Sequence, residues 1–285
     1  MSTNPIEQHT EADRWAGEMG EKWNTHHKRF EGMIAPLGQA LIESAHFQPG
    51  ERVIDVGCGA GVTSLEIARR VGPTGSVTGL DISPALVRTS TARAKEAGLT
   101  NARFVEGDAS KADVGETGFD CLFSRFGIMF FPDPYGAFKH MHGFVKPGGR
   151  AVFACWGPQP ENAWVTEVMA LVLRYVQLPP PVPRAPGPFA FAEQDYTRDI
   201  LAKAGFKDVT MTAWRGEQCI GGPGSNAKSA TEFLTETLFV GEALKEVPEE
   251  TRQKALAELE ALLASHEGSD GVRMQGMAWI VSAKA

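Results

Sequence analysis

The sequence predicts an α/β fold built on a mainly parallel, doubly wound sheet. Between residues 52 and 156, short apolar segments alternate with segments of helical periodicity. Strands separated by helices in this way form βαβ units, whose parallel sheet is covered by helices on both faces. In addition, three successive apolar segments end close to an aspartate, which indicates polar groups at one edge of the sheet.

The core strands are expected in five apolar segments. They are RVIDVG (52–57), SVTGLD (76–81), ARFVEGD (102–108), FDCLFSRF (119–126) and RAVFACW (150–156). The intervening helices are expected at 62–72, 83–98 and 133–145. The second of these has Ser83 as its N-cap, Pro84 in its first turn and Gly98 at its C-terminal end, all three typical of those positions.

The remaining segments are expected to extend this core rather than to form a second full domain. After residue 156 a helix at 162–176 and a proline-rich stretch at 178–189 are too long for an ordinary connection. A strand is expected at 209–214, followed by an insertion with an amphipathic helix at 248–266. The expected parts are N-terminal lid helices (1–48), the core (49–156), a cap insertion (157–192), a core continuation (193–215), a helical insertion (216–276) and a final core strand (277–285).

The N-terminal segment predicts a helix over residues 11–30 and a second one over 36–47. On the first helix an apolar stripe includes a histidine, and its members are Trp15, Met19, Trp23, His26 and Phe30. His26 is expected to point inward.

Composition and charge exclude several classes of protein. The net charge of −7 and the pI of about 5.6 argue against a nucleic-acid partner, because an acidic surface repels phosphate backbones. No run of about 18 apolar residues and no signal-peptide pattern is present, so we expect a cytoplasmic protein without a membrane partner. The four cysteines and the acidic residues lack metal-ligand spacing, which predicts free thiols and no metal.

The segment VIDVGCGAG (53–61) places Asp55 just before three glycines at every second position, Gly57, Gly59 and Gly61. In an open parallel sheet, ligands bind beyond the carboxyl ends of the strands where the strand order reverses. Glycines at such a turn let the backbone bend sharply and let a ligand approach without meeting a Cβ atom. The alternative is a tight turn that binds nothing.

Two further aspartates favour a nucleotide-like ligand. Asp81 ends the second strand, where a carboxylate can bind both ribose hydroxyls, and Asp108 ends the third, within plausible reach of an adenine amino group. Either one alone would more often be a helix cap or a solvated strand end. The dinucleotide fingerprint GxGxxG is not met, since Val62 stands where its last glycine should be. The carboxylate of Asp55 also suits an ammonium group better than a diphosphate.

On these motifs the chain resembles the class I S-adenosylmethionine-dependent methyltransferases, within the UbiE-like group that acts on small molecules. The matching segments are VIDVGCGAG (53–61), VTGLDIS (77–83), FVEGDA (104–109), FDCLFSRFGIMFF (119–131) and KPGGRAVFACW (146–156). The resemblance implies a Rossmann-like sheet of about seven strands, of which the last, at WIVSAKA, is antiparallel to the others. It also implies S-adenosylmethionine as the cofactor and S-adenosylhomocysteine as its product.

The resemblance further implies a set of cofactor-binding residues, which are Asp55, Gly57, Gly59, Gly61, Asp81, Ile82, Asp108, Ala109 and Ser124. Asp55 and the glycine turn would hold the methionine moiety. Asp81 would bind the ribose, and Ile82 would pack on the adenine. Asp108 and Ala109 would contact the edge of the adenine, while Ser124 would offer backbone contacts below the sulfonium.

Methyl transfer from a sulfonium needs alignment and exclusion of water more than it needs a catalytic motif, and we find no such motif. A base is required only for an acceptor that arrives protonated, and His26 is the candidate. Large side chains at the lid or the mouth of the site suit an acceptor with apolar surface, and these are Trp23, Phe30, Met129, Phe130 and Trp156. Ordinary core packing is the alternative explanation for them.

These expectations together favour transfer of a methyl group to oxygen, carbon or nitrogen of a small, partly apolar acceptor by in-line displacement in an enclosed pocket. Aromatic, quinone-like and keto-acid acceptors all fit. A non-catalytic protein that binds the cofactor or its product is the first alternative. A nicotinamide-dependent dehydrogenase is the second. The acceptor and the oligomeric state stay open at this point.

Overall fold

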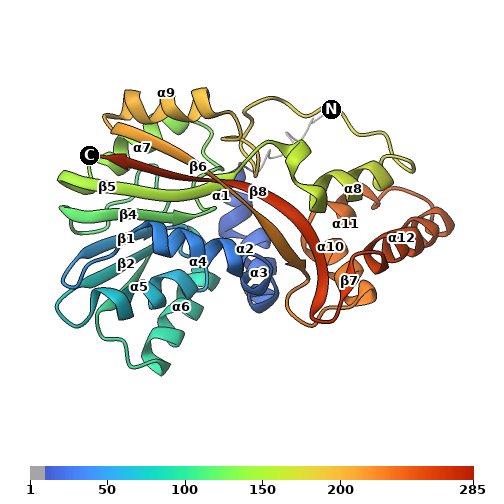
Figure 1. Cartoon of the computed structure of the whole chain (residues 1–285), viewed down its shortest axis with the longest axis horizontal. Coiled ribbons are helices and arrows are strands. Elements are labelled where there is room, and N and C mark those ends of the chain that lie inside the picture. The colour runs from blue at the N-terminus through green and yellow to red at the C-terminus, as the bar shows by residue number, and fades with distance from the viewer. Residues whose placement is uncertain (1–9) are drawn as a thin grey trace, which may run out of the picture.

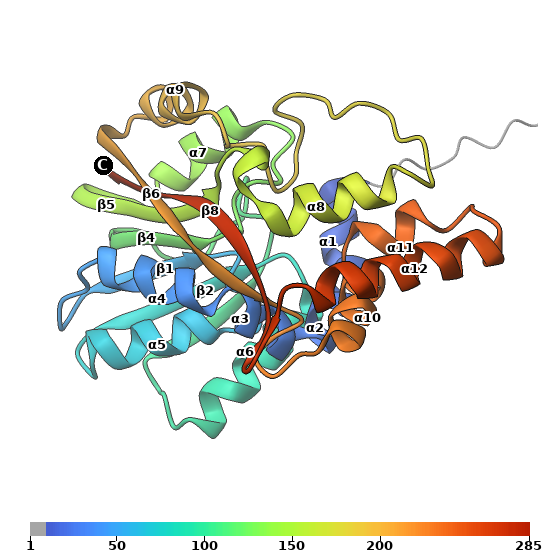
Figure 2. The same cartoon turned by 45° about the vertical axis from the view of Figure 1, so that its right-hand side comes forward.

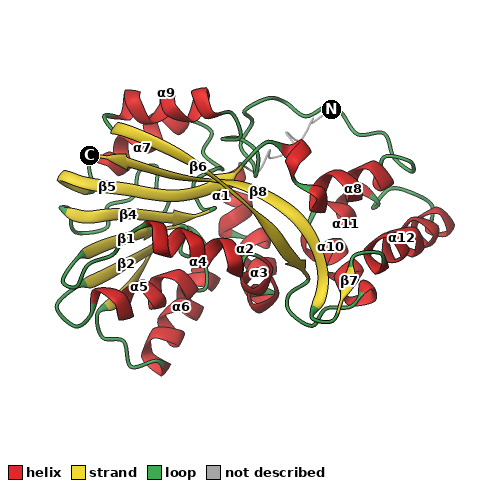
Figure 3. Cartoon of the chain, in the orientation of Figure 1, coloured by secondary structure: helices red, strands yellow, loops and turns green. Residues whose placement is uncertain are grey.

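The computed structural model describes residues 10–285 as an α/β protein with one mixed sheet (Figures 1 and 3). The spatial order of the strands is β3-β2-β1-β4-β5-β8-β6, with the short β7 paired to β8. The strands are β1 (Arg52–Val56), β2 (Ser76–Asp81), β3 (Ala102–Glu106), β4 (Phe119–Arg125), β5 (Val145–Trp156), β6 (Lys207–Ile220), β7 (Glu267–Gly268) and β8 (Gly271–Lys284).

The pairing of the strands confirms the predicted fold class. Strands β1 to β5 pair in parallel, and β8 is antiparallel to both of its neighbours, β5 and β6. The strand order reverses between β1 and β4, so the carboxyl ends of these two strands form the switch point at which such sheets bind ligands. Asp55, near the end of β1, is paired with Gly79 of β2 and Phe123 of β4.

Helices cover both faces of the sheet, as βαβ units require (Figure 1). On one face lie α4 (Ala35–Ser44), α5 (Val62–Val71) and α6 (Pro84–Glu96). On the other lie α7 (Pro134–His142) and α9 (Gln194–Ala204), which pack against each other. Among residues 10–285, no helix is both long and apolar enough to cross a bilayer.

Strands β6 and β8 continue past the core as a long ribbon that carries a second lobe of helices (Figure 2). This lobe contains α10 (Ala227–Thr237), α11 (Phe239–Ala243) and α12 (Glu249–Ala264), and α8 (Ala163–Val172) packs on α12 and β8. The short 3-10 helix η1 (Gln159–Glu161) precedes α8.

The predicted bounds of these two strands were wrong. The strand expected at 209–214 extends to Ile220, and the final strand expected at 277–285 begins at Gly271. The added stretches RGEQCI and GVRMQG contain glycines and charged residues, which disfavour a strand by composition. They form one because each supplies the hydrogen bonds of the other, from Arg215 paired with Met277 to Ile220 paired with Val272.

The N-terminal segment is also more divided than expected. The single helix predicted over 11–30 is three short helices, α1 (Glu11–Ala16), α2 (Glu18–Thr25) and α3 (His27–Met33). The breaks fall at Gly17 and at His26, whose backbone angles leave the helical range. Of the resulting helices, α2 packs on α6, and α3 packs on α4 and β6. We call α1 to α3 the N-terminal lid.

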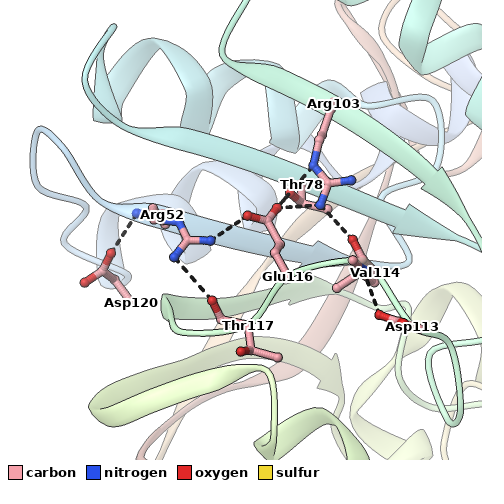
Figure 4. A network of polar contacts seen from close by, with 9 residues as sticks. Arg52, Thr78, Arg103, Asp113, Val114, Glu116, Thr117 and Asp120 are labelled. Atoms are coloured by element: carbon pink, nitrogen blue, oxygen red, sulfur yellow. Dashed lines mark hydrogen bonds and ion pairs between the residues drawn. The ribbon is translucent and has the colours of Figure 1, made fainter.

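At the amino ends of β1, β2 and β3, one carboxylate ties three strands together (Figure 4). Glu116 accepts hydrogen bonds from Arg52 at 2.5 Å, from Thr78 at 2.7 Å and from Arg103. Burial alone would raise the pKa of Glu116, but these hydrogen bonds lower it to about 2. The network lies at the opposite end of the strands from the switch point, so it stabilises the sheet without entering the site.

Candidate functional site

The turn between β1 and α5 depends on its three glycines. Gly57, Gly59 and Gly61 all have positive φ, at 66°, 57° and 84°. A Cβ atom at Gly57 would lie 2.5 Å from the Cα atom of Gly127, and one at Gly61 would lie 2.8 Å from Cβ of Ser90. At Gly59 the nearest atom to such a Cβ is Nε1 of Trp23, 3.9 Å away. The first and third glycines thus allow close packing, whereas the second leaves the backbone open to a ligand.

The carboxylate of Asp55 is completely buried beneath this turn. One oxygen, Oδ2, accepts hydrogen bonds from the hydroxyls of Thr63 at 2.8 Å and Ser64 at 2.6 Å. The other, Oδ1, has no hydrogen-bond partner among the described residues. Burial raises the pKa of Asp55 to about 6, although the two hydroxyls act in the opposite direction. A buried oxygen without a donor is uncommon and fits a donor supplied by a ligand.

Asp81 connects the glycine turn to the next one along the sheet. Its Oδ2 accepts from the backbone N–H of Gly59 at 2.8 Å, and its Oδ1 accepts from the N–H of Ser83 at 2.9 Å. Burial raises the pKa of Asp81. Both oxygens keep further lone pairs, so the side chain can position the turn and still accept hydrogen bonds from a pair of hydroxyls.

The other residues predicted to bind the cofactor lie at the same edge of the sheet, and some of them already make hydrogen bonds to neighbouring residues. Asp108 accepts from both the N–H and the hydroxyl of Ser110, so it caps its own turn, and Ala109 is buried beside it. Ser124 is buried and donates to the carbonyl of Val56 at 2.7 Å, which holds β4 to β1. Ile82 is partly exposed.

A continuous row of aromatic side chains runs across this edge. Phe130 after β4 contacts Trp15 at a centroid distance of 5.0 Å, and Trp15 contacts Trp23 at 5.6 Å. Trp23 is stacked on Phe30 at 3.7 Å, and Phe30 contacts Phe233 of α10 at 4.9 Å. The row therefore links the switch point, the N-terminal lid and the second lobe.

Polar contacts hold the N-terminal lid to the core. Asn24 accepts a hydrogen bond from Thr89 of α6 at 2.6 Å, and Glu31 is paired with Arg93 of α6 at 2.6 Å. Gly20 lies against Ser83, where a Cβ atom would come within 2.4 Å of the hydroxyl oxygen. The helices are thus placed by specific contacts rather than lying loosely over the site.

A second set of contacts holds the lid to the second lobe. Arg29 donates to the carbonyls of Gly221 and Ser229, and its guanidinium lies 4.9 Å from the ring centre of Phe233. Gly32 lies close to Pro223, where a Cβ atom would be 2.4 Å from the proline ring. The lid is therefore fixed from both sides.

Of the residues predicted to line the pocket, Trp23, Phe30 and Phe130 belong to the aromatic row, and the other two lie in the interior. Met129 and Trp156 are both buried, and Trp156 is stacked on Phe126 at a centroid distance of 4.1 Å. Trp156 also contacts Trp164 of α8 at 5.2 Å, so the cap insertion packs on the end of β5. These ring contacts show that Trp156 packs in the interior, which is the alternative explanation given for it above.

His26 lies at the bend between α2 and α3 and is mostly buried, with 22% of its side chain exposed. Its Nε2 atom is 3.9 Å from a carboxylate oxygen of Glu236 on α10. The neighbouring His27 has its Nδ1 atom 2.7 Å from the carbonyl of Asn24. The expected role of His26 as a base stays a hypothesis, and Glu236 would be its partner.

The sequence reasoning missed two residues of this edge, Arg125 and Phe126. Phe126 adopts a positive φ of 65°, which is rare for a bulky residue. Arg125 ends β4 and is the one basic residue in the apolar run FDCLFSRF, a signal that was available in the sequence. All four cysteines are free and buried, as expected.

Comparison with known proteins identifies the core. Residues 47–172 match the model of a family described as a methyltransferase domain. This stretch begins before β1 and ends in α8, so it includes the glycine turn, Asp81 and the end of β4. Residues 47–172 are therefore similar to a methyltransferase domain. The resemblance predicted from the motifs is thereby confirmed.

Two curated relatives are similar to this chain over less than half of its length. Aklanonic acid methyltransferase DauC from Streptomyces sp. (strain C5) is 33% identical over 120 residues, covering 42% of this chain and 54% of the relative. Demethylmenaquinone methyltransferase from Geobacillus kaustophilus is 31% identical over 137 residues, covering 46% and 58%. The chain thus spans little more than half the length of these relatives, and the second lobe lies outside the matched region.

Solved structures share the fold at low sequence identity. YcgJ from Bacillus subtilis aligns with a TM-score of 0.55 at 18% identity, covering 88% of this chain and 98% of its own. Phosphoethanolamine N-methyltransferase 2 from Haemonchus contortus, solved with S-adenosyl-L-methionine, gives 0.57 at 14%, covering 99% and 61%. The [4+2]-cyclase SpnF gives 0.54 at 17%, covering 96% and 97%. These neighbours support the architecture of the methyltransferase domain.

The raised pKa of Asp55 predicts a pH-dependent stability. The folded protein holds the proton of the Asp55 carboxyl more tightly than the unfolded chain does. The stability that this proton contributes is therefore fully present below about pH 3.8, and it is lost as the pH rises through about 6. Ionising Asp55 at pH 7 then costs about 3 kcal/mol. Asp55→Asn should raise the free energy of unfolding at pH 7 by up to about that amount and leave it nearly unchanged at pH 3.5.

Denaturant unfolding of both proteins at the two pH values checks this expectation. Asparagine keeps an oxygen for Thr63 and Ser64, so the comparison isolates the charge. A loss of stability at pH 7, or an equal gain at both pH values, would contradict the assigned cause.

Proposed function

We propose that this protein transfers the methyl group of S-adenosylmethionine to a small, partly apolar acceptor. The observation that carries the proposal is the unbonded Oδ1 of Asp55 beneath an open glycine turn, with the carboxylate of Asp81 beside it. The pair suits a ligand with an ammonium group at one end and a ribose at the other. A diphosphate would be repelled by both carboxylates.

The residues present fit this cofactor. Asp55 would accept from the ammonium of the methionine moiety, and the exposed backbone at Gly59 would allow close approach. Asp81 has free lone pairs for the ribose hydroxyls, and the partly exposed Ile82 lies next to it for contact with the adenine. Asp108 and Ala109 would border the adenine edge, while the backbone at Ser124 would lie below the sulfonium.

The protein's own part in the reaction is alignment and enclosure. When bound, the cofactor supplies a methyl carbon already activated by the sulfonium, which the acceptor attacks in line with the departing sulfur. The lid, held on both sides, would exclude water from this point and keep competing hydrolysis slow. Phe130, Trp15 and Trp23 offer flat apolar surfaces against which an acceptor can be oriented.

The acceptor class follows from the same surfaces. An acceptor that lay against Trp23, Phe30 and Phe130 would meet aromatic surfaces, which favours an aromatic or quinone-like molecule. Met129 and Trp156 are buried and would add apolar surface only where the acceptor reached them. Two relatives are named for aklanonic acid and demethylmenaquinone, which agrees with that choice. Oxygen, carbon and nitrogen acceptors all remain compatible, as do keto acids.

The alternative to methyl transfer is a protein that binds the cofactor without turnover, and an experiment has to separate the two. One neighbour of the same fold is named as a [4+2]-cyclase, so this architecture is not restricted to methyl transfer. A nicotinamide-dependent dehydrogenase is disfavoured by Val62, which replaces the last glycine of the dinucleotide fingerprint, and by the two carboxylates.

Turnover is tested by a screen of phenols, quinone precursors, keto acids and amines with S-adenosylmethionine, following release of S-adenosylhomocysteine. We expect phenols or quinone precursors to give a methylated product in the mass spectrum. Binding of the cofactor with no product from any class would favour the non-catalytic alternative. Tight binding of NADH without binding of S-adenosylhomocysteine would overturn the proposal.

Replacement of Asp81 tests the cofactor site directly. Asp81→Ala should weaken binding of S-adenosylhomocysteine by more than about tenfold, because two hydrogen bonds from the ribose to a carboxylate are lost. Isothermal titration calorimetry measures the change. Asp113→Ala is the matched control, since Asp113 also accepts from a backbone N–H in its own turn but lies in the exposed loop before β4. Equal affinity of the Asp81 variant and the wild type would exclude the ribose assignment.

The hypothesis that His26 removes a proton makes a separate prediction. His26→Ala should lower the turnover of a protonated acceptor by about a hundredfold and leave the affinity for S-adenosylhomocysteine unchanged. His27→Ala, the adjacent histidine bonded to Asn24, is the control and should keep its turnover. Full turnover by the His26 variant would remove the base from the mechanism.

A further inference from the structure

Arg125, the last residue of β4, is partly buried and lies beside α4. A Cβ atom at Gly38 would be 2.9 Å from its Nη1 atom, so the glycine on α4 leaves room for the guanidinium. Phe123, two residues earlier on the same face of the strand, contacts Phe47 just beyond the end of α4. The side chain thus enters the space between β4, α4 and the lid.

The guanidinium of Arg125 is charged but lacks a close partner. Among residues 10–285 it makes no hydrogen bond and no ion pair within 4 Å, and only longer-range attraction from Glu31 and Asp55 acts on it. Burial lowers the pKa of Arg125. Other partly buried arginines are bonded, such as Arg150, which is paired with both oxygens of Glu51. Its side chain is only partly buried, and its five donors have no acceptor among the described residues, so they are available to a ligand that enters this space.

The negative groups near Arg125 do not neutralise it. Glu31 is already bonded to Arg93 through both of its oxygens. Asp55 uses Oδ2 for two hydroxyls, and its Oδ1 is unbonded. Asp55 and Arg125 come from neighbouring strands, with Asp55 paired to Phe123, yet they do not bond to each other. One edge of the sheet therefore holds a free acceptor and a free set of donors.

These unused groups match the two ends of an amino-acid zwitterion. An ammonium and a carboxylate attached to one carbon lie close together, so a ligand whose ammonium contacts Asp55 places its carboxylate only a few ångström away. Resting on the proposed function, which brings S-adenosylmethionine to this edge, we propose that Arg125 binds the carboxylate of the cofactor's methionine moiety. A guanidinium offers two parallel donors to a carboxylate, a geometry that favours it over other side chains.

The test compares three ligands that differ only at the amino-acid end. They are S-adenosylhomocysteine, its decarboxylated analogue and 5′-methylthioadenosine, which lacks the amino acid altogether. In calorimetric titrations, Arg125→Met should weaken S-adenosylhomocysteine by at least about tenfold, the amount expected for hydrogen bonds between charged groups. The affinities for the other two ligands should stay within about twofold, since neither has a carboxylate.

Two further variants make the result specific. Arg125→Lys keeps the charge and should recover part of the lost affinity for S-adenosylhomocysteine. Arg88→Met removes an exposed arginine of α6 and should leave all three affinities unchanged. Retained binding of 5′-methylthioadenosine by Arg125→Met shows that this variant is folded.

Three outcomes would overturn the inference. Equal weakening of all three ligands would make Arg125 a structural residue. Unchanged affinity for S-adenosylhomocysteine, with a raised KM for the acceptor, would assign Arg125 to the acceptor instead. If the wild type bound neither S-adenosylhomocysteine nor 5′-methylthioadenosine, the proposed function itself would fail, and the inference with it.

Discussion

The carboxylate of Asp81 is the contact on which the rest of the site depends. It accepts from Gly59 in the turn after β1 and from Ser83 at the start of α6, so it fixes two turns relative to each other. Ser83 in turn lies against Gly20 of α2, and α2 carries Trp23 above Gly59. The buried acid at the end of β2 therefore helps to set the position of the lid over the glycine turn, together with the contacts of the lid to α6 and to the second lobe.

Enclosure of the site comes from parts of the chain that are far apart in sequence. The lid lies between α6 of the core, through Asn24 and Glu31, and the second lobe, through Arg29. Phe30 contacts Phe233, so the aromatic row ends on a helix that the long β6–β8 ribbon holds in place. Lid and lobe meet through several contacts, among them those of Arg29 and Phe30, so movement of either part would change the space left for an acceptor.

The parts that sequence could predict are those set by local patterns. The alternation of strands and helices predicted the sheet and its switch point, and the glycine turn, Asp55, Asp81 and Asp108 lie at the expected edge of that sheet. The ribbon was missed because RGEQCI and GVRMQG become strands only by pairing with each other, a contact across more than fifty residues. The bends at Gly17 and His26 likewise depend on what the lid packs against.

The unpaired charges of this edge are better understood as binding groups than as contributions to the fold. A core that had only to fold would be more stable with apolar side chains in place of Asp55 and Arg125, since neither charge is fully compensated. Asp108 shares part of this pattern, since its Oδ1 accepts both hydrogen bonds from Ser110 and its Oδ2 is left for a ligand and for the exposed Lys111, 3.6 Å away. A ligand that bonds to Asp55 and Arg125 stabilises the folded state, by an amount that grows with the logarithm of its concentration relative to Kd.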